Sequence, residues 1–191
     1  RYCLLSRGLG DVYKRQESGR RDLTIISNNA GTFERGIAAL LIRKQVRKII
    51  CSHPRPPNSD AFARAFRAGE VELECVPQGT LAERLRAAGA GLGPFYTPTG
   101  YGTELAAGRR QEVIDGVGYV LEHPLRGDYA LIRAHLGDRW GNLMYRHAAR
   151  NFNPVMCMAA GHAIAQVDEV VPLGTFCLLY TSDAADEGLG V

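Results

Sequence analysis

The amino-acid sequence predicts an α/β fold in which an open, mostly parallel sheet carries helices on both faces. From residue 23 to residue 89, short apolar runs alternate with stretches of helical spacing, as in strands joined by crossover helices. The first two runs, LTIIS (23–27) and KIICS (48–52), are compact and rich in β-branched residues, which is typical of buried strands. The length of the chain suits one domain with a sizeable core.

Each element of this alternation has its own sequence signal. The strand at 23–27 ends at the turn signal NNAG, and residues 36–45 place apolar side chains at helical spacing. The strand at 48–52 ends at a proline-rich segment, after which Asn58 or Ser59 is expected to cap a helix. The apolar face of that helix is expected to comprise Ala61, Phe62, Ala65 and Phe66.

The second half of the alternation is less regular. Residues 71–76 (VELECV) alternate polar and apolar side chains, which predicts a strand with one exposed face. Thr80 is expected to open the next helix, because Glu83 follows at the spacing of a capping box. Residues 89–103 are rich in Gly, Pro, Thr and Tyr and show little helix or strand pattern, which is typical of a functional loop. Beyond it the sequence predicts strands at 119–122, 129–136, 141–145 and 162–171, with a short helix at 154–160.

The two ends of the chain do not share the pattern of the middle. Residues 11–16 (DVYKRQ) can be encoded by gatgtgtataagagacag, and the reverse complement of that DNA, read one base in, encodes residues 177–182 (CLLYTS). One short duplex therefore accounts for both strings, and we predict that residues 1–16 and 177–191 are translated sequencing adapter and not native, so they are left out of the fold prediction. The native part is then 17–176, a fragment cut at both ends. The alternative is a genuine basic arm and a genuine acidic tail.

Composition excludes several classes of function. The formal net charge of +3 is too small for a nucleic-acid footprint, and no apolar run approaches the length that spans a bilayer. Cys51, Cys75 and Cys157 show no C-x-x-C spacing, and the histidines show no metal-binding spacing. We therefore expect a cytoplasmic protein with reduced thiols, without a bound metal and without nucleic acid or membrane as a partner.

Candidate ligand-binding residues lie between the carboxyl end of a predicted strand and the start of the next helix, which is the usual ligand position in α/β sheets. Asn28 and Asn29 follow the first strand, and their amides are able to hold an anionic or carbonyl oxygen; a simple turn is the alternative. Gln78 and Gly79 stand between a strand and a helix, where Gln78 either donates to an oxyanion or satisfies local backbone. Gly91 lies in a glycine-rich loop, where the absence of a side chain lets the backbone pass close to a ligand or to another subunit.

No catalytic nucleophile is evident. The sequence has no G-x-S-x-G elbow, and Glu17-Ser18-Gly19 is better explained as a helix end stopped by glycine. The segment 139–150 is rich in arginine and contains Trp140, which suggests either RNA stacking or, more simply, packing of the indole between strands.

Several motifs occur together in one order: SNNAG, RKIICS, VPQGTLAERLRAAGAGLGPFYTPTGYGTELAAG and GDRWGNLMYRHAARNFNPVMCMAA. In this set and order the chain resembles the A subunits of 3-oxoacid CoA-transferases over residues 22–175. The resemblance implies the α/β fold of the NagB/RpiA-like CoA-transferase type. The strings ICSHPR, GVGYVLEHPL and GDRWGNL look more like enzymes acting on 3-oxoadipate than like enzymes acting on acetoacetate.

The resemblance implies a transferase that moves CoA from succinyl-CoA to a 3-oxo acid by covalent catalysis. The nucleophilic glutamate is expected on a partner chain, the B subunit, in a heterodimer or heterotetramer, so no catalytic residue is expected in this chain. CoA is a substrate, and no cofactor is expected. Asn28, Asn29 and Gln78 match positions near the reacting carboxylate, whereas the family's G-G-F-G segment is absent. The resemblance also implies a cleft wall or a subunit contact for a loop that includes Gly91, Tyr96, Thr97, Gly100 and Tyr101. The alternatives are a non-catalytic ligand sensor on a similar α/β domain and an RNA-binding protein.

Overall fold

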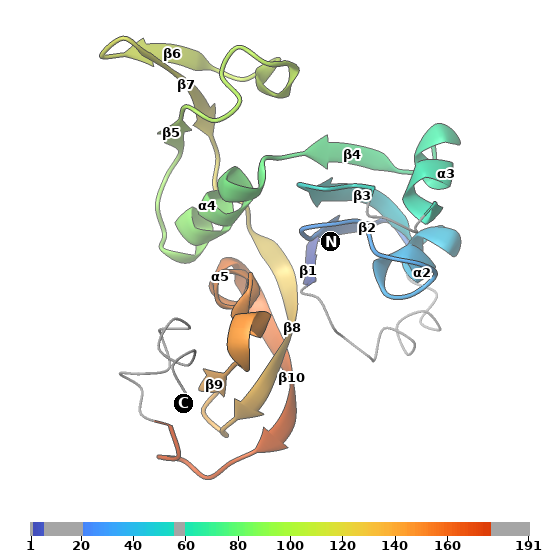
Figure 1. Cartoon of the computed structure of the whole chain (residues 1–191), viewed down its shortest axis with the longest axis vertical. Coiled ribbons are helices and arrows are strands. Elements are labelled where there is room, and N and C mark those ends of the chain that lie inside the picture. Colours follow the sequence, from blue (N-terminus) through green and yellow to red (C-terminus); the bar gives the residue numbers. More distant parts are fainter. Residues whose placement is uncertain (1, 6–20, 56–59, 177–191) are drawn as a thin grey trace.

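The computed structural model of the protein describes residues 2–5, 21–55 and 60–176. Within them one large sheet contains seven strands in the order β10-β8-β1-β2-β3-β4, with β9 paired to β8 (Figure 1). Neighbours in that order are parallel, and only β9 is antiparallel to its partner. These strands are β1 (Tyr2–Leu5), β2 (Leu23–Ile26), β3 (Val46–Cys51), β4 (Glu72–Cys75), β8 (Gly127–Gly137), β9 (Leu143–Met144) and β10 (Ala160–Val170).

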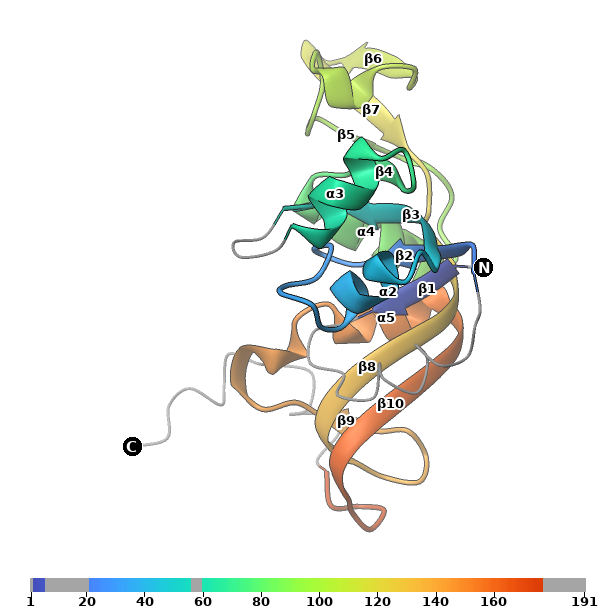
Figure 2. The ribbon, with the colours of Figure 1, turned by 90° about the vertical axis from the view of Figure 1, so that its right-hand side faces the viewer.

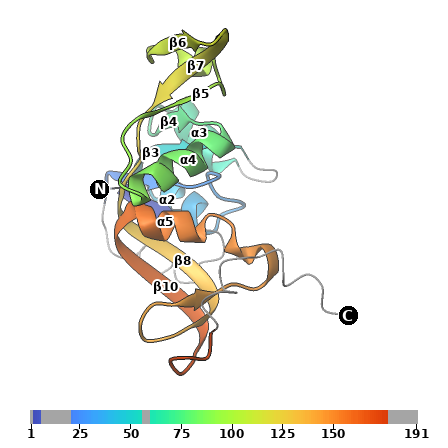
Figure 3. The ribbon, with the colours of Figure 1, turned by 90° about the vertical axis from the view of Figure 1, so that its left-hand side faces the viewer.

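Helices cover both faces of this sheet, as Figures 2 and 3 show from opposite sides. One face carries α2 (Ile37–Ile42) and α3 (Ala61–Arg67), and the other carries α4 (Gln78–Gly89) and α5 (Asn153–Ala159). The predicted fold class is therefore confirmed, together with the predicted positions of the main strands and helices.

The alternation of side chains along the strands divides the core into two layers. Ile25 and Ile49 belong to the apolar cluster with α2 and α3. Their neighbours Ile26 and Ile50 belong to the cluster with α4 and α5. Successive side chains of a strand point to opposite faces of the sheet, so a residue's place in the sequence fixes the helices that it meets.

A second, antiparallel sheet lies beyond β4, the strand at one edge of the large sheet (Figure 1). It consists of β5 (Phe95–Thr97), β7 (Val117–Glu122) and β6 (Gln111–Ile114), in that order. The prediction that residues 89–103 lack strand structure is therefore wrong for Phe95–Thr97. A strand of three residues is too short to show a periodic pattern in the sequence, and it exists because β7 supplies its hydrogen-bonding partner.

Several predictions about helix ends and packing are also wrong. The helix α4 begins at Gln78 with Pro77 at the N-cap and no capping side chain, so Thr80 lies inside the first turn and its buried hydroxyl has no hydrogen-bond partner. Phe66 stacks on Phe62 but stays 49% exposed. Trp140 is 72% exposed, in a turn held by the carboxylate of Asp138, and does not pack between strands. The proposed caps Asn58 and Ser59, and residues 17–19, lie outside the described residues.

The strand β1 comes from a segment that was left out of the fold prediction. Tyr2–Leu5 fall within residues 1–16, and they pair in parallel with β2 on one side and β8 on the other. The backbone groups along the facing edges of β2 and β8 need partners, and the short run YCLL supplies them. The adapter origin of residues 1–16 and 177–191 remains a prediction, as does the native domain 17–176.

At two positions the chain needs glycine because another element passes too close to leave room for a side chain. Gly31 has a φ of 90°, and a Cβ there would lie 2.5 Å from the backbone nitrogen of Ala38. A Cβ on Gly89 would lie 2.5 Å from the Cβ of Met158. Glycine at these positions therefore lets α2 approach the end of β2 and lets α5 pack closely on α4.

Candidate functional site

The carboxyl ends of β2 and β3 bring Asn28 and Ser52 side by side. Ile26 pairs with Ile50 in the parallel ladder, and Asn28 and Ser52 stand two residues further along each strand. The ladder continues past the strands, since the backbone N–H of His53 donates to the carbonyl oxygen of Asn28 at 3.0 Å. Because side chains alternate, both residues point to the face that carries α4.

Gln78, the first residue of α4, completes a three-residue cluster with Asn28 and Ser52. The Oδ1 atom of Asn28 accepts a hydrogen bond from Ser52 Oγ at 2.6 Å and another from Gln78 Nε2 at 3.0 Å. Two of the residues predicted for the site, 50 positions apart, thus touch each other. Ser52 was not among the predicted residues, although its equal offset from the paired isoleucines is a signal in the sequence.

The neighbouring Asn29 has a different role. It points to the opposite face, is buried, and its Oδ1 atom accepts the backbone N–H of Gly31 at 2.9 Å. This is an Asx-type turn, in which the side chain replaces a backbone acceptor. The structure therefore brings Asn28, but not Asn29, into the cluster with Gln78.

The start of α4 adds backbone donors beside this cluster. Gln78 and Gly79 are exposed, and no side chain caps the helix. The first N–H groups of a helix have no partner within it and carry the positive end of the helix dipole. An amide side chain, a hydroxyl and free N–H groups at the ends of parallel strands are a suitable set for an anionic oxygen.

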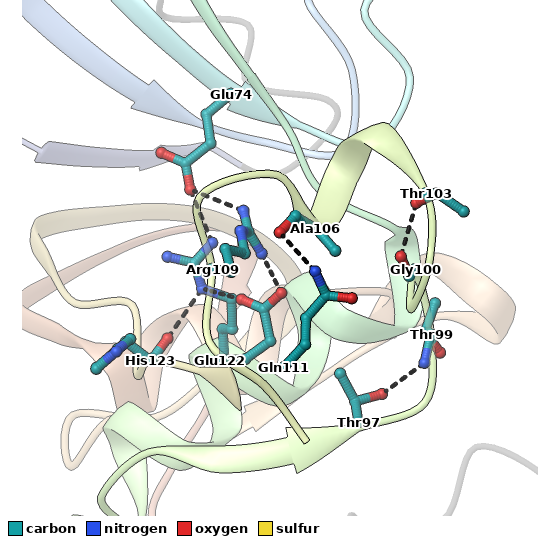
Figure 4. Close-up of polar contacts among 11 residues, drawn as sticks. Glu74, Thr97, Thr99, Gly100, Thr103, Ala106, Arg109, Gln111, Glu122 and His123 are labelled. Carbon is teal, nitrogen blue, oxygen red and sulfur yellow. Dashed lines mark hydrogen bonds and ion pairs between the residues drawn. The ribbon is translucent and has the colours of Figure 1, made fainter. Parts of the chain in front are cut away.

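The predicted cleft or interface loop lies away from this cluster, in and beside the small sheet. Gly91 follows α4 directly, with a φ of 70°. Tyr96 Oη donates to Glu112 Oε2 at 2.5 Å, and this hydrogen bond raises the pKa of Tyr96. The hydroxyl of Thr97 accepts the backbone N–H of Thr99, and the carbonyl of Gly100 accepts the hydroxyl of Thr103 (Figure 4).

Tyr101 completes this loop, and its ring covers Gly118 of β7 so closely that no Cβ would fit there. In the described part of the chain, no hydrogen bond joins the loop to Asn28 or Gln78. A role in a subunit interface or a cleft wall therefore remains a prediction for Gly91, Tyr96, Thr97, Gly100 and Tyr101.

An ion network anchors the small sheet to α4 and to the large sheet (Figure 4). Arg84 Nη1 donates to Glu74 Oε1 at 2.8 Å, and Arg84 Nε donates to the carbonyl oxygen of His123 at 2.9 Å. Glu122 of β7 pairs with Arg109 and lies 3.7 Å from Arg84 Nε. Arg84 and Glu122 are buried, so the network replaces the water that these charges lose.

The acid that the large sheet contributes to this network is Glu74, a residue of the edge strand β4. Burial alone raises the pKa of its carboxyl, but hydrogen bonds from Arg84 and Lys48 outweigh burial and lower the pKa. Glu74 is therefore a carboxylate near neutral pH, and its charge balances part of the positive charge of the two arginines and the lysine.

The thiol of Cys51, at the end of β3, is expected to be unreactive. Burial, with a smaller contribution from Cys75, raises the pKa of Cys51 to about 12, so the nucleophilic thiolate is absent at ordinary pH. We expect native protein incubated with iodoacetamide at pH 8 to leave Cys51 unmodified, whereas denatured protein is alkylated there. Peptide mass spectrometry measures the difference, and rapid labelling of Cys51 in the native state would contradict it.

Two other kinds of feature are not found in the parts of the chain that the structure describes. No group of three or more His, Cys, Asp or Glu side chains is placed to hold a metal ion. None of the helices combines the length and the apolar character needed to cross a bilayer.

Comparison with known proteins places the chain. A model of the Coenzyme A transferase family matches residues 11–179. The chain belongs to the coenzyme A transferase family. The resemblance seen in the motifs is therefore confirmed, and relatives named as A subunits share most of the chain's length.

This CoA-transferase is similar to two curated relatives and to one solved structure, as follows. The A subunit of the 3-oxoadipate CoA-transferase of Pseudomonas putida is 64% identical over 82% of the chain and 68% of the relative. The A subunit of a probable succinyl-CoA:3-ketoacid coenzyme A transferase of Bacillus subtilis is 46% identical over 83% of the chain and 66% of the relative. The acyl-CoA transferase YdiF of Escherichia coli O157:H7, as a thioester complex with CoA, superimposes with a TM-score of 0.77 at 22% identity. That match covers 94% of the chain and 43% of YdiF and supports the fold alone.

Proposed function

We propose that this chain is the A subunit of a succinyl-CoA:3-oxoacid CoA-transferase whose acceptor is 3-oxoadipate. The observation that carries the proposal is the 64% identity with the Pseudomonas putida 3-oxoadipate relative. The Bacillus subtilis 3-ketoacid relative, at 46%, makes acetoacetate the second candidate acceptor. The free thiols Cys51, Cys75 and Cys157 support a cytoplasmic location.

The partner in this proposal is a B subunit that carries a nucleophilic glutamate. Its carboxylate attacks the thioester carbonyl of succinyl-CoA, and loss of CoA thiolate leaves an acyl-glutamyl anhydride. The thiolate then attacks the glutamyl carbonyl, which gives a glutamyl-CoA thioester and releases succinate. The acceptor carboxylate repeats the two steps in reverse, so that acyl-CoA leaves and the glutamate is restored.

The part of this chain would be to stabilise the oxyanion that forms at each attack. Asn28 and Gln78 present amide groups beside the free N–H groups at the start of α4. Donors held in place before the reaction are worth more than water, because they need no reorganisation when charge develops. The chain itself then needs no nucleophile.

Reconstitution tests the proposal. We expect no activity from the full-length A subunit on its own, whereas its complex with the B subunit should transfer CoA from succinyl-CoA to 3-oxoadipate. The formation of 3-oxoacyl-CoA measures turnover, with acetoacetate as the matched acceptor that lacks the second carboxylate. A higher kcat/KM for acetoacetate would reassign the acceptor, and failure to transfer CoA to any 3-oxo acid would overturn the function.

A further inference from the structure

We propose that Ser52 is a positioning residue for CoA transfer, because its hydroxyl fixes the orientation of the Asn28 amide at the reacting centre. The inference rests on the proposed function and adds a residue to it. Ser52 Oγ lies 2.6 Å from Asn28 Oδ1, and Ser52 stands at the end of β3, where it is half-buried.

The hydrogen bonds determine which end of the Asn28 amide faces outward. An amide oxygen accepts two hydrogen bonds through its two lone pairs. The single proton of the Ser52 hydroxyl has two acceptors within reach, Asn28 Oδ1 at 2.6 Å and the Asn28 carbonyl oxygen at 3.1 Å, and the shorter contact is the one to Oδ1. Ser52 Oγ and Gln78 Nε2 therefore occupy both positions on Oδ1. The Nδ2 group, on the other side of the amide, is then directed away from Ser52 and is the part of Asn28 available to donate to an oxyanion.

The backbone holds Ser52 more firmly than it holds Gln78. Ser52 follows directly on β3, and its neighbour His53 bridges to Asn29 and donates to the carbonyl of Asn28. The Ser52 carbonyl oxygen also lies 4.0 Å from Cys75 Sγ of β4. Gln78, in contrast, is exposed at the first turn of α4. The hydroxyl is therefore the rigid member of the pair that orients Asn28.

Loss of the hydroxyl would free the amide to turn over. The terminal torsion of asparagine is broad and roughly two-fold, so an amide held by Gln78 alone also populates the opposite orientation. In that orientation Oδ1 faces the developing oxyanion and repels it. Ser52 makes no direct contact with the reacting atoms in this scheme, so its removal should lower kcat and leave substrate binding unchanged.

The test uses the full-length A subunit in complex with its B subunit. We expect Ser52→Ala to lower kcat by roughly 10- to 100-fold, the scale of a misplaced catalytic group. The KM for succinyl-CoA should change by less than about twofold, because ground-state binding is untouched. Ser52→Thr keeps the hydroxyl and should recover most of the loss, whereas Ser52→Cys keeps the shape with only a weak donor and should not.

A double-mutant cycle separates positioning from a merely structural role. If Ser52 acts through Asn28, adding Ser52→Ala to Asn28→Ala should cause no further loss of kcat. Thr175→Val is the matched control, since it removes a hydroxyl that donates to Pro172 in an exposed turn, and it should leave kcat unchanged. Multiplicative losses in the double variant, or an unchanged kcat in Ser52→Ala, would refute the inference. An inactive wild-type complex would instead refute the proposed function.

Discussion

Replacing Glu122 with alanine is expected to lower the free energy of unfolding by about 3–5 kcal/mol, the scale for removing one partner of a buried ion pair. Glu122 is 4% exposed and pairs with Arg84 and Arg109. Without it, Arg84, Arg109 and Lys48 share the single carboxylate of Glu74. The excess positive charge would remain in a region from which water is largely excluded.

The loss should be measured by urea unfolding of the isolated chain. Glu83→Ala is the matched control, because Glu83 lies on the same helix as Arg84 and pairs at 2.7 Å with Arg86 while both side chains are about half exposed. Exposed pairs of this kind contribute about 0.3–0.5 kcal/mol. Equal losses in the two variants would show that the network contributes no more than a surface ion pair.

The ion network also shows which signals in the sequence were available and missed. Leu81, Leu85 and Ala88 form the buried face of α4, and Arg84 lies on that same face. A charged residue on an apolar helix face is rarely buried without a partner, so Arg84 pointed to a buried acid. The identity of the acid was not predictable, because Glu122 belongs to a sheet that only the folded chain brings to α4.

The alternating pattern of strands and helices was predictable because it depends on local spacing. The strands β2 and β3 follow from compact apolar runs, and the helix α2 follows from apolar side chains at helical spacing. The helix α5 follows from a short run rich in Met and Ala. The start of α4 was not predictable in the same way, because a cap depends on where the first turn forms. Helix α4 begins at Gln78 rather than Thr80, and that difference of two residues places Gln78 beside Asn28.

The different roles of Asn28 and Asn29 were predictable only in part. Both were predicted for the site on their position after a strand. The period of two along a strand assigns them to opposite faces, but the face that carries α4 depends on how the crossover connections pack. In the folded chain Ile26 pairs with Ile50, and both lie on the face that carries α4. Asn28 and Ser52 each follow two residues later, so their side chains point to that same face.

Replacing Gln78 with alanine in the full complex is expected to lower turnover by ~10²-fold, the scale of losing one oxyanion donor. The change removes an amide at the start of α4 and also takes from Asn28 Oδ1 one of its two hydrogen bonds. Gln166→Ala is the matched control, because Gln166 lies on β10 at the far side of the sheet and its buried Oε1 atom has no partner to lose.

Gln78→Glu distinguishes donation from shape. The carboxylate keeps the size of the side chain but has no N–H, and it would face Asn28 Oδ1, an acceptor that now lies 3.0 Å from Nε2. Repulsion between the two oxygens, together with a negative charge beside the developing oxyanion, should make the loss of kcat at least as large as for alanine. If Gln78→Glu kept wild-type turnover, Gln78 would be a spacer and the oxyanion would depend on Asn28 and the backbone N–H groups of α4.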